Sequence, residues 1–420
     1  MLPPEARMVM HSVYNIIIVG ARVGGASAAM LLARRGYKVL LVDRAPYGSD
    51  IAHGHYVHKS GPRLLRKWGL LDRITASGCA PCTSATIDVG AFAITGRDLV
   101  VDGIAAGYGP RRGVLDRVLI DAAVEAGAEY RDNFVVDGYT IEAGRIAGIR
   151  GRDLLTGATV TERAHLIIGA DGRNSMLARI VKAAEYETVP TLNCWYYSYW
   201  SGVSLTGLHI NIRDRQMIIT HPTNDGLTLV AVSWPIAEQH SVQASLEQRF
   251  MRAVDLCPSL SAAIRSGQRE ERFYGAANLP NFLRKPFGRG WALVGDAGCH
   301  KDPAMGLGCG DAMRDASFLA DAVDEGLGGS RPLYDALAGY EQRRNEATLA
   351  DYRLNMRQAS FAPPSHEEMR LMAALPGNQE AINRFFLARE GMIPQEWFFN
   401  PGNITRVIAA GSPPALAVAC

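Results

Sequence analysis

The stretch from Asn15 to Asp43 constrains the fold more than any other part of the chain. The run Ile16 to Val19 is short, apolar and rich in β-branched residues, which is typical of a parallel strand buried on both faces. Gly20 then permits a sharp turn, and Gly25 allows the following small-residue helix to pack close to the strand. A second apolar run, Lys38 to Val42, completes a strand, turn, helix and strand of the kind that binds dinucleotides.

The start of this helix is expected to face a diphosphate, because free backbone N–H groups and the positive end of the helix dipole attract anions. Asp43 lies 18 positions after Gly25, where a carboxylate can accept the hydroxyls of an adenosine ribose and would repel a 2′-phosphate. The spacing therefore favours FAD or NAD over NADP. Arg22 replaces the usual middle glycine, and its side chain either pairs with the diphosphate or points away from it. A plain strand–helix–strand unit without a nucleotide is the alternative.

Size and composition indicate a globular protein of two or three domains. The chain has 420 residues, 48% of them apolar, and its 44 basic and 42 acidic residues leave a net charge of +2. This balance predicts no nucleic-acid or membrane partner. No apolar run approaches the ~18 residues of a membrane span, and the segment from Met1 to Val13 lacks a signal-peptide pattern. We therefore expect a cytoplasmic protein.

The cysteines and the clustered histidines predict no metal centre. Seven scattered cysteines fit a reducing compartment, and an odd number fits a closed disulfide set poorly. Cys79 and Cys82 form a close pair, but zinc sites of this type need a second pair. His53, His55 and His58 have no cysteine or carboxylate partner nearby, so lining a pocket or lying on the surface is favoured over binding a metal.

The chain beyond Asp43 alternates predicted helices and strands before its character changes. The pattern predicts a helix from Pro62 to Leu71 and another from Val114 to Ala126. Arg112 would stand at the start of the second helix, where a guanidinium binds a phosphate or the cofactor edge, or is only a surface charge. Strands are predicted over Phe134–Ile141, Arg145–Arg150 and Ala164–Gly169. The last strand runs into Asp171 and Gly172, and the carboxyl end of a parallel strand is a common ligand position.

A β-rich region follows from residue 189 to 273. Trp195, Tyr197 and Tyr199 share one strand face, while Tyr196, Ser198 and Trp200 share the other. Because both faces carry aromatic rings, one of them must meet something apolar outside the sheet. The rings are interpreted either as core or as the floor of a pocket.

The last third of the chain returns to a buried strand that ends in Gly295 and Asp296. A glycine-rich loop follows, and a helix is expected to begin at Asp311. Bare backbone N–H groups ahead of a helix start stabilise negative charge. From Pro332 onward the sequence predicts helices, interrupted at residues 363–364 and 376–377.

Three blocks stand in order: the Gly20 turn with Asp43, the turn at Asp171, and Gly295–Asp296 with its glycine loop. Together they resemble the class A flavoprotein monooxygenases, the para-hydroxybenzoate hydroxylase-like family, over residues 14 to 345. The resemblance implies an α/β fold class. A discontinuous, Rossmann-like FAD-binding domain would comprise 10–80, 106–188 and 275–345; a β-rich substrate domain would comprise 81–105 and 189–274; and 346–420 would form a helical C-terminal segment.

The resemblance also implies roles for individual residues. Gly20, Gly25 and Asp43 would hold the ADP half of FAD, with Arg22 and Arg44 beside them. Arg112 would contact the flavin side, and Asp296 would bind the ribityl or ribose hydroxyls. The isoalloxazine ring would be backed by Pro303, Gly306 and Gly308. Asp171 and Gly172 would touch FAD. Asp171 and Gly172 would also touch the incoming nicotinamide. Arg22 and Asp311 depart from the family pattern.

The implied reaction has two halves. NAD(P)H reduces FAD, and O2 then reacts with the flavin so that a hydroperoxide transfers one oxygen atom to a small, aromatic or heteroaromatic substrate. Substrate-wall candidates are Tyr197, Tyr199, His209 and His221, for which core tyrosines and surface histidines are the alternative. The sequence leaves the oligomeric state open.

Three other kinds of protein share parts of this sequence pattern. Flavin halogenases carry a Trp-x-Trp-x-Ile-Pro stretch, whereas this chain has Val232-Ser-Trp-Pro-Ile236, with one tryptophan and a displaced proline. Prenyl-lipid reductases, which act on an unsaturated substrate, are also similar. A non-enzymatic FAD-binding protein would bind the cofactor without turning over NAD(P)H.

Overall fold

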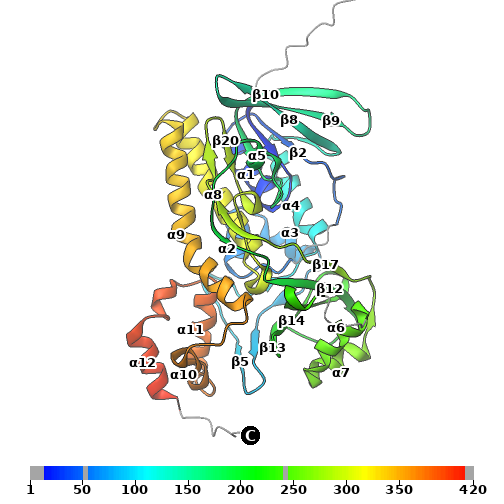
Figure 1. The fold of residues 1–420 in the computed structure, drawn as a ribbon, viewed down its shortest axis with the longest axis vertical. Coiled ribbons are helices and arrows are strands. Elements are labelled where there is room, and N and C mark those ends of the chain that lie inside the picture. The colour runs from blue at the N-terminus through cyan, green and yellow to red at the C-terminus, as the bar shows by residue number, and fades with distance from the viewer. Residues whose placement is uncertain (1–13, 51–54, 240–244, 412–420) are drawn as a thin grey trace, which may run out of the picture.

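The computed structural model describes residues 14–50, 55–239 and 245–411. An upper α/β body, a lower β-rich body and a group of C-terminal helices lie against one another (Figure 1). The main sheet of the upper body has the strand order β19-β20-β10-β1-β2-β7. Its strands are β1 (Tyr14–Val19), β2 (Val39–Val42), β7 (Glu129–Arg131), β10 (Thr159–Gly169), β19 (Phe287–Gly288) and β20 (Trp291–Leu293).

The centre of this sheet is parallel and buried on both faces. β1 pairs in parallel with β2 and β10, and β10 pairs in parallel with β20. Ile16 and Ile18 pack under α1 (Val23–Ala33), α4 (Arg112–Glu125) and α8 (Gly308–Leu327), whereas Ile17 faces the opposite side. On that side β8 (Phe134–Glu142) and β9 (Arg145–Asp153) form an antiparallel extension with β10. Double coverage explains why β1 is apolar from Ile16 to Val19.

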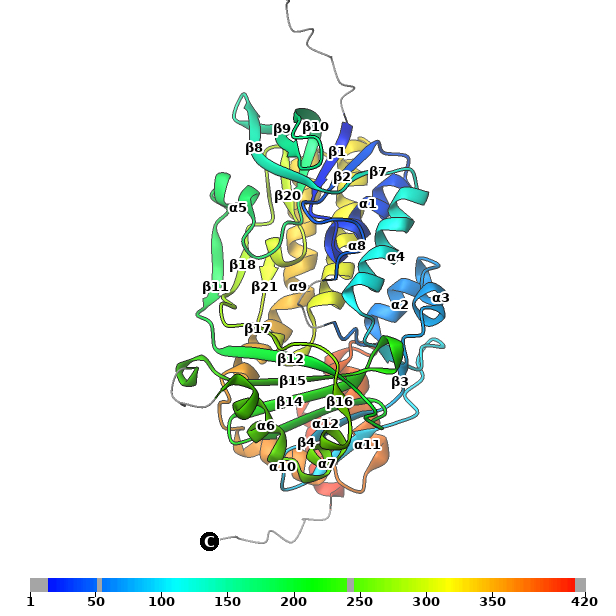
Figure 2. The same ribbon diagram turned by 90° about the vertical axis from the view of Figure 1, so that its right-hand side faces the viewer.

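The second large sheet has the order β16-β12-β15-β14-β13-β4-β5. Its strands are β4 (Ala85–Asp88), β5 (Ala93–Gly96), β12 (Asn193–Ser201), β13 (Leu208–Arg213), β14 (Gln216–Pro222), β15 (Thr228–Pro235), β16 (Gln268–Arg269) and the attached β17 (Tyr274–Ala276). α6 (Leu246–Asp255) and α7 (Pro258–Ser266) lie beneath it (Figure 2) and pack against Tyr196 and Trp200. The face with Trp195, Tyr197 and Tyr199 is the other one, as the alternation predicts.

The C-terminal region is helical and is broken where the prolines predict. α9 (Leu333–Ala359) lies along α8, and α10 (His366–Ala374), α11 (Gln379–Arg389) and α12 (Pro401–Ala410) follow. Apolar side chains of the last three helices pack against β4 and β5. None of the described helices is long and apolar enough to cross a bilayer. The predicted α/β fold class, with a β-rich body and C-terminal helices, is confirmed.

Two element boundaries differ from the sequence interpretation. The single helix expected over residues 62–71 is two helices, α2 (Ser60–Lys67) and α3 (Leu71–Ala76), because Gly69 between them has φ +76° and ends the first. α8 begins at Gly308, three positions before the expected Asp311.

The remaining elements are β3 (Pro81–Cys82), β6 (Gly107–Tyr108), β11 (Glu185–Val189), β18 (Asn281–Arg284), β21 (Cys299–His300), α5 (Met176–Ile180) and the 3₁₀ turns η1 (Asn224–Gly226), η2 (Ile236–Glu238), η3 (Gly295–Ala297), η4 (Pro303–Met305) and η5 (Gln395–Trp397).

Candidate functional site

β1 and α1 meet at a turn that requires glycine. Gly20 has φ +105°, and a side chain there would overlap the carbonyl oxygen of Ala170. A Cβ on Gly25 would overlap the carbonyl oxygen of Gly20. The first turn of α1 has no acidic residue and no side-chain cap. Its backbone N–H groups are therefore available to an anion.

Asp43 is fixed at the carboxyl end of β2, beside this turn. Its Oδ2 accepts a hydrogen bond from the backbone N–H of Ala21 at 2.7 Å, and its Oδ1 accepts one from Ala45 at 2.8 Å. A carboxylate has more acceptor positions than these two bonds use, so it can still accept ribose hydroxyls. Arg44 beside it is exposed.

Two guanidinium groups share one buried carboxylate near the starts of α1 and α4. Arg112, the first residue of α4, donates through Nη2 to both oxygens of Asp116 at 3.0 and 3.1 Å. Nη1 of Arg22 lies 3.7 Å from Oδ2 of the same carboxylate. Burial raises the pKa of Asp116, although both arginines oppose this shift. The group carries one positive charge in excess.

Asp171 and Gly172 follow β10 at the same edge of the sheet. Oδ2 of Asp171 accepts the backbone N–H of Met176 at 2.8 Å, at the start of α5. Oδ1 is buried and has no partner among the described residues. Burial raises the pKa of this carboxyl group. Gly172 has φ +77° and open space where a side chain would project, so a ligand can approach the backbone there.

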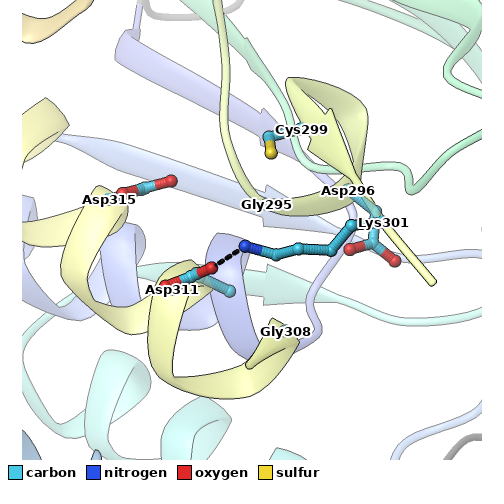
Figure 3. Close-up of a pocket in the computed structure, with 8 residues that line it drawn as sticks. Gly295, Asp296, Cys299, Lys301, Gly308, Asp311 and Asp315 are labelled. Carbon is cyan, nitrogen blue, oxygen red and sulfur yellow. Dashed lines mark hydrogen bonds and ion pairs between the residues drawn. The ribbon is translucent and has the colours of Figure 1, made fainter. Parts of the chain in front are cut away.

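Asp296 lines a small cavity between η3 and the start of α8. The cavity holds about 20 Å³, and its walls are Gly295, Asp296, Cys299, Lys301, Gly308, Asp311, Ala312 and Asp315 (Figure 3). The Lys301 side chain crosses it toward Asp311. A cavity of this size accommodates one water molecule or a single ligand hydroxyl.

The acid at position 311, a departure from the family pattern, is neutralised by two cations. Lys301 contacts its carboxylate, and Nη1 of Arg314 donates to it at 2.6 Å. Burial favours the protonated form of Asp311, but Arg314 and Lys301 hold its pKa below the ordinary value. The N-terminus of α8 therefore keeps its affinity for negative charge.

The loop before α8 is joined to the second sheet. Pro303 opens η4, and Gly306 ends it with φ +65°. Asp302 precedes this turn and is almost completely buried; its Oδ1 accepts hydrogen bonds from Nε1 of Trp195 and from the N–H of Ala304, each at 3.0 Å. Burial raises the pKa of Asp302 to about 6. This contact fixes β12 relative to the loop that the resemblance assigns to the flavin ring.

A buried histidine orients Tyr199 on the inner face of the second sheet. His55 Nδ1 lies 3.1 Å from the carbonyl oxygen of Gly109, and Nε2 lies 2.8 Å from the Tyr199 hydroxyl. Because a carbonyl only accepts, Nδ1 carries the proton and Tyr199 donates to Nε2. Burial lowers the pKa of His55 well below its ordinary value, so the imidazole is neutral at physiological pH.

Tyr197 and His221 lie beside this pair. The Tyr197 ring packs edge-on against Tyr199 with centroids 5.8 Å apart, and the His221 ring lies 5.5 Å from that of His55. Burial lowers the pKa of His221 to about 4. Arg111, held by Asp50 and Glu271, stacks 4.2 Å from the centre of the Tyr199 ring. Three of the four substrate-wall candidates are thus brought together.

The structure separates His209 from the other candidates. His209 pairs with Thr220, the neighbour of His221, so its side chain lies on the opposite face of the sheet from His221. Its Nε2 contacts the carbonyl oxygen of Thr206 at 2.8 Å.

The histidine-rich loop reaches the same region from the other side. His53 lies outside the described residues. Nε2 of His58 contacts the carbonyl oxygen of Met305 at 2.9 Å, in the loop before α8. No group of three potential metal ligands occurs within the described part of the chain. The loop therefore connects the Tyr199 face with the residues around Gly306.

Sequence reasoning missed the contacts that complete this face. The spacing of the histidines marked the loop of His55, but nothing local indicated its contact with Tyr199, 144 positions away. The link between Trp195 and Asp302 likewise joins residues 107 positions apart. The sequence analysis assigned no role to Arg111.

The polar groups fit FAD. The required glycines leave room for a diphosphate at α1, and Asp43 offers acceptors for a ribose. Oδ1 of Asp171, which has no hydrogen-bond partner within the described residues, can accept a hydrogen bond from the cofactor. The cavity at Asp296 and the N-terminus of α8 suit the ribityl chain and an electron-rich ring edge.

Comparison with known proteins agrees with this fit. The chain belongs to the FAD-binding-domain family, whose model matches residues 13–350. It is a FAD-dependent oxidoreductase of the class A flavoprotein monooxygenase type.

Individual relatives span more than one activity. A digeranylgeranylglycerophospholipid reductase of Methanocella arvoryzae is 25% identical over 80% of this chain and 84% of its own length. A kynurenine 3-monooxygenase of Salinispora tropica is 27% identical, covering 91% of this chain and 86% of its own. The myxobacterial chondrochloren halogenase CndH has a similar fold, with a TM-score of 0.78 and 19% identity over 95% of this chain and 96% of its own.

Proposed function

We propose that this protein hydroxylates a small aromatic or heteroaromatic substrate, with NAD(P)H as electron donor and O2 as the source of the oxygen atom. The observation that carries this proposal is the inner sheet face of Tyr197, Tyr199 and His221, joined by Trp195 and Asp302 to the loop before α8. Bound FAD supplies the redox chemistry. The β-rich region, residues 81–105 and 189–274, supplies the substrate wall.

The residues of this face bind and orient the substrate. Tyr199 donates its proton to His55, so its oxygen keeps lone pairs that accept a hydrogen bond from a substrate hydroxyl or N–H. The Tyr197 ring, which stacks on that of Tyr274 with centroids 5.4 Å apart, extends the aromatic wall for a ring substrate. The neutral histidines and the aromatic rings exclude water, which favours transfer of oxygen to the substrate over release of peroxide.

The test is substrate-stimulated oxidation of NADH and NADPH, with O2 uptake, across a panel of phenols and heteroaromatic compounds. Incorporation of one atom from ¹⁸O2 into the product identifies hydroxylation. We expect Tyr197→Phe and Tyr199→Phe to lower coupled product formation and raise peroxide release while FAD remains bound. His209→Asn, on the other face of the sheet, is the matched control. Wild-type coupling in both tyrosine variants would place the substrate elsewhere.

Reduction of an unsaturated lipid is the second candidate, favoured by the similarity to the Methanocella arvoryzae reductase. A reductase saturates its substrate and consumes no O2 in doing so. The same assay decides, because product formation under anaerobic conditions with a reduced donor occurs only for the reductase. Halogenation is separated by adding chloride or bromide and examining the product mass.

A further inference from the structure

Arg22 occupies the position at which the dinucleotide fingerprint usually has its middle glycine. Its backbone is extended, with φ −89° and ψ −168°, so no glycine is needed there for conformational reasons. Gly20 and Gly25, by contrast, cannot carry a Cβ. The fold therefore requires two of the three glycines and leaves the third position free to carry a side chain.

The Arg22 guanidinium is incompletely paired. Its Nη1 is shielded from solvent and has no hydrogen-bond partner among the described residues. The nearest carboxylate, Asp116, is 3.7 Å away and already accepts hydrogen bonds from Arg112 through both oxygens. Burial lowers the pKa of Arg22, and Arg112 and Arg44 also oppose its charge, while Asp116 and Asp43 favour it.

An anion bound at the start of α1 would supply the hydrogen-bond acceptor that Nη1 of Arg22 lacks. Arg22 is the N-cap residue of this helix, whose first turn lacks any acidic side chain. α1 packs beside α4, whose first residue is Arg112 (Figure 2). Two helix N-termini and an excess of one guanidinium charge converge here, and FAD carries two negative charges on its diphosphate.

We propose that Arg22 binds the FAD diphosphate, to which it donates through the Nη1 group that has no hydrogen-bond partner within the described residues. Asp116 holds Arg22 and Arg112 near each other without neutralising both. The charge of a side chain then replaces the close backbone approach that a middle glycine allows. This inference rests on FAD binding and is independent of the substrate and of oxygen transfer.

The test measures FAD and ADP affinity in the full-length chain. FAD is removed, and the dissociation constants of FAD, ADP and AMP are determined by titration for wild type, Arg22→Met, Arg22→Lys and Arg34→Met. Arg34, at the other end of α1, is an exposed arginine on the same helix. Charged hydrogen bonds lead us to expect that Arg22→Met weakens FAD and ADP binding about tenfold or more, and weakens the binding of AMP, which has one phosphate group, by a smaller factor.

Arg22→Lys should recover part of the loss, and Arg34→Met should bind like wild type. Wild-type affinity for FAD should also fall as NaCl is raised, with a shallower dependence in Arg22→Met. Equal FAD and ADP affinities in Arg22→Met and Arg34→Met would overturn the proposal. If Arg22→Met does not fold, salt-independent FAD binding by wild type, together with unaltered binding by Arg22→Lys, would overturn it equally. NAD(P)H turnover by the loaded wild-type enzyme tests the proposed function separately.

Discussion

Asp296 stands where the buried strand β20 passes into η3, at the wall of the cavity beside α8. We expect Asp296→Ala to yield largely FAD-free protein with its fold intact, because a ligand hydroxyl loses a charged acceptor worth about 1.5–3 kcal/mol. Asp296→Asn, which keeps one acceptor oxygen, should retain more FAD. Bound flavin is measured by absorbance and folding by circular dichroism. Full FAD occupancy in the alanine variant would show that Asp296 does not contact the cofactor.

The buried His221 should make the stability of the protein depend on pH. Its pKa in the folded protein is about 4, lowered by burial, whereas an unfolded histidine titrates near 6.5. As pH falls below about 6.5, His221 becomes protonated in the unfolded chain but stays neutral in the folded protein. The folded state therefore loses stability until the pH reaches the folded-state pKa of His221. Above this range the histidine contributes no pH dependence.

We expect wild type to lose about 2 kcal/mol more stability between pH 7 and pH 5 than His221→Asn, whose side chain does not titrate. Urea unfolding at the two pH values measures the difference. His366→Asn, a change at an exposed histidine, should follow wild type. If His221→Asn loses as much stability as wild type, then His221 is protonated or accessible in the folded state.

The role of a single residue could be predicted from the sequence only where it depends on residues nearby in the chain. The glycines at positions 20 and 25 follow from a turn formed by neighbouring residues, and sequence reasoning named both. The partner of Arg22 could not be foreseen, because Asp116 comes from another helix. Strand alternation correctly grouped Tyr197 with Tyr199, but a histidine on a neighbouring strand is assigned to a face only by register, which placed His209 opposite His221.

At the scale of elements, α2 is joined to the end of α11 by a buried ion pair. Nζ of Lys59 lies 2.9 Å from Oε2 of Glu390, and the two side chains are 1% and 2% exposed. The pair connects the segment after the histidine loop to the C-terminal helices, 331 positions along the chain. Neither charge has access to water if its partner is removed.

We therefore expect Glu390→Ala to destabilise the protein by about 3–5 kcal/mol, because it leaves the Lys59 ammonium buried and unpaired. The double change Lys59→Met with Glu390→Leu should recover much of the loss, since it removes both charges and keeps the volume. Arg73→Ala, which breaks the exposed pair with Glu125, is the control and should have little effect. Equal stability of the single and double variants, measured by urea unfolding, would contradict this account.

Element boundaries followed the sequence where a strong local signal exists. Pro363 and Pro364 separate α9 from α10, and Pro376 separates α10 from α11. The helix start at Gly308 was misplaced because glycine is a poor helix former, and the packing of α8 against α1 overrides that propensity. The turn at Gly69 was missed because the apolar pattern continues through it.

At the scale of the whole molecule, the residues expected to bind FAD come from distant parts of the chain. Gly20 and Asp43 lie near the start of the described chain, Arg112 begins α4, and Asp171 follows β10. Asp296 comes after all the strands of the second large sheet. The order of the parallel strands brings them to one edge. A ligand that bridges these segments should stabilise the fold as a unit.

We expect purified protein to be yellow, with about one FAD per chain, and its melting temperature to rise with added FAD. A ligand that binds only the folded state adds about 2.7 kcal/mol when its free concentration is 100 times the dissociation constant. Differential scanning fluorimetry across an FAD series measures the shift. Asp43→Ala removes the acceptor fixed beside the β1–α1 turn, so its curve should move to higher FAD concentrations. Colourless protein whose melting temperature is independent of FAD would exclude FAD as the resident cofactor.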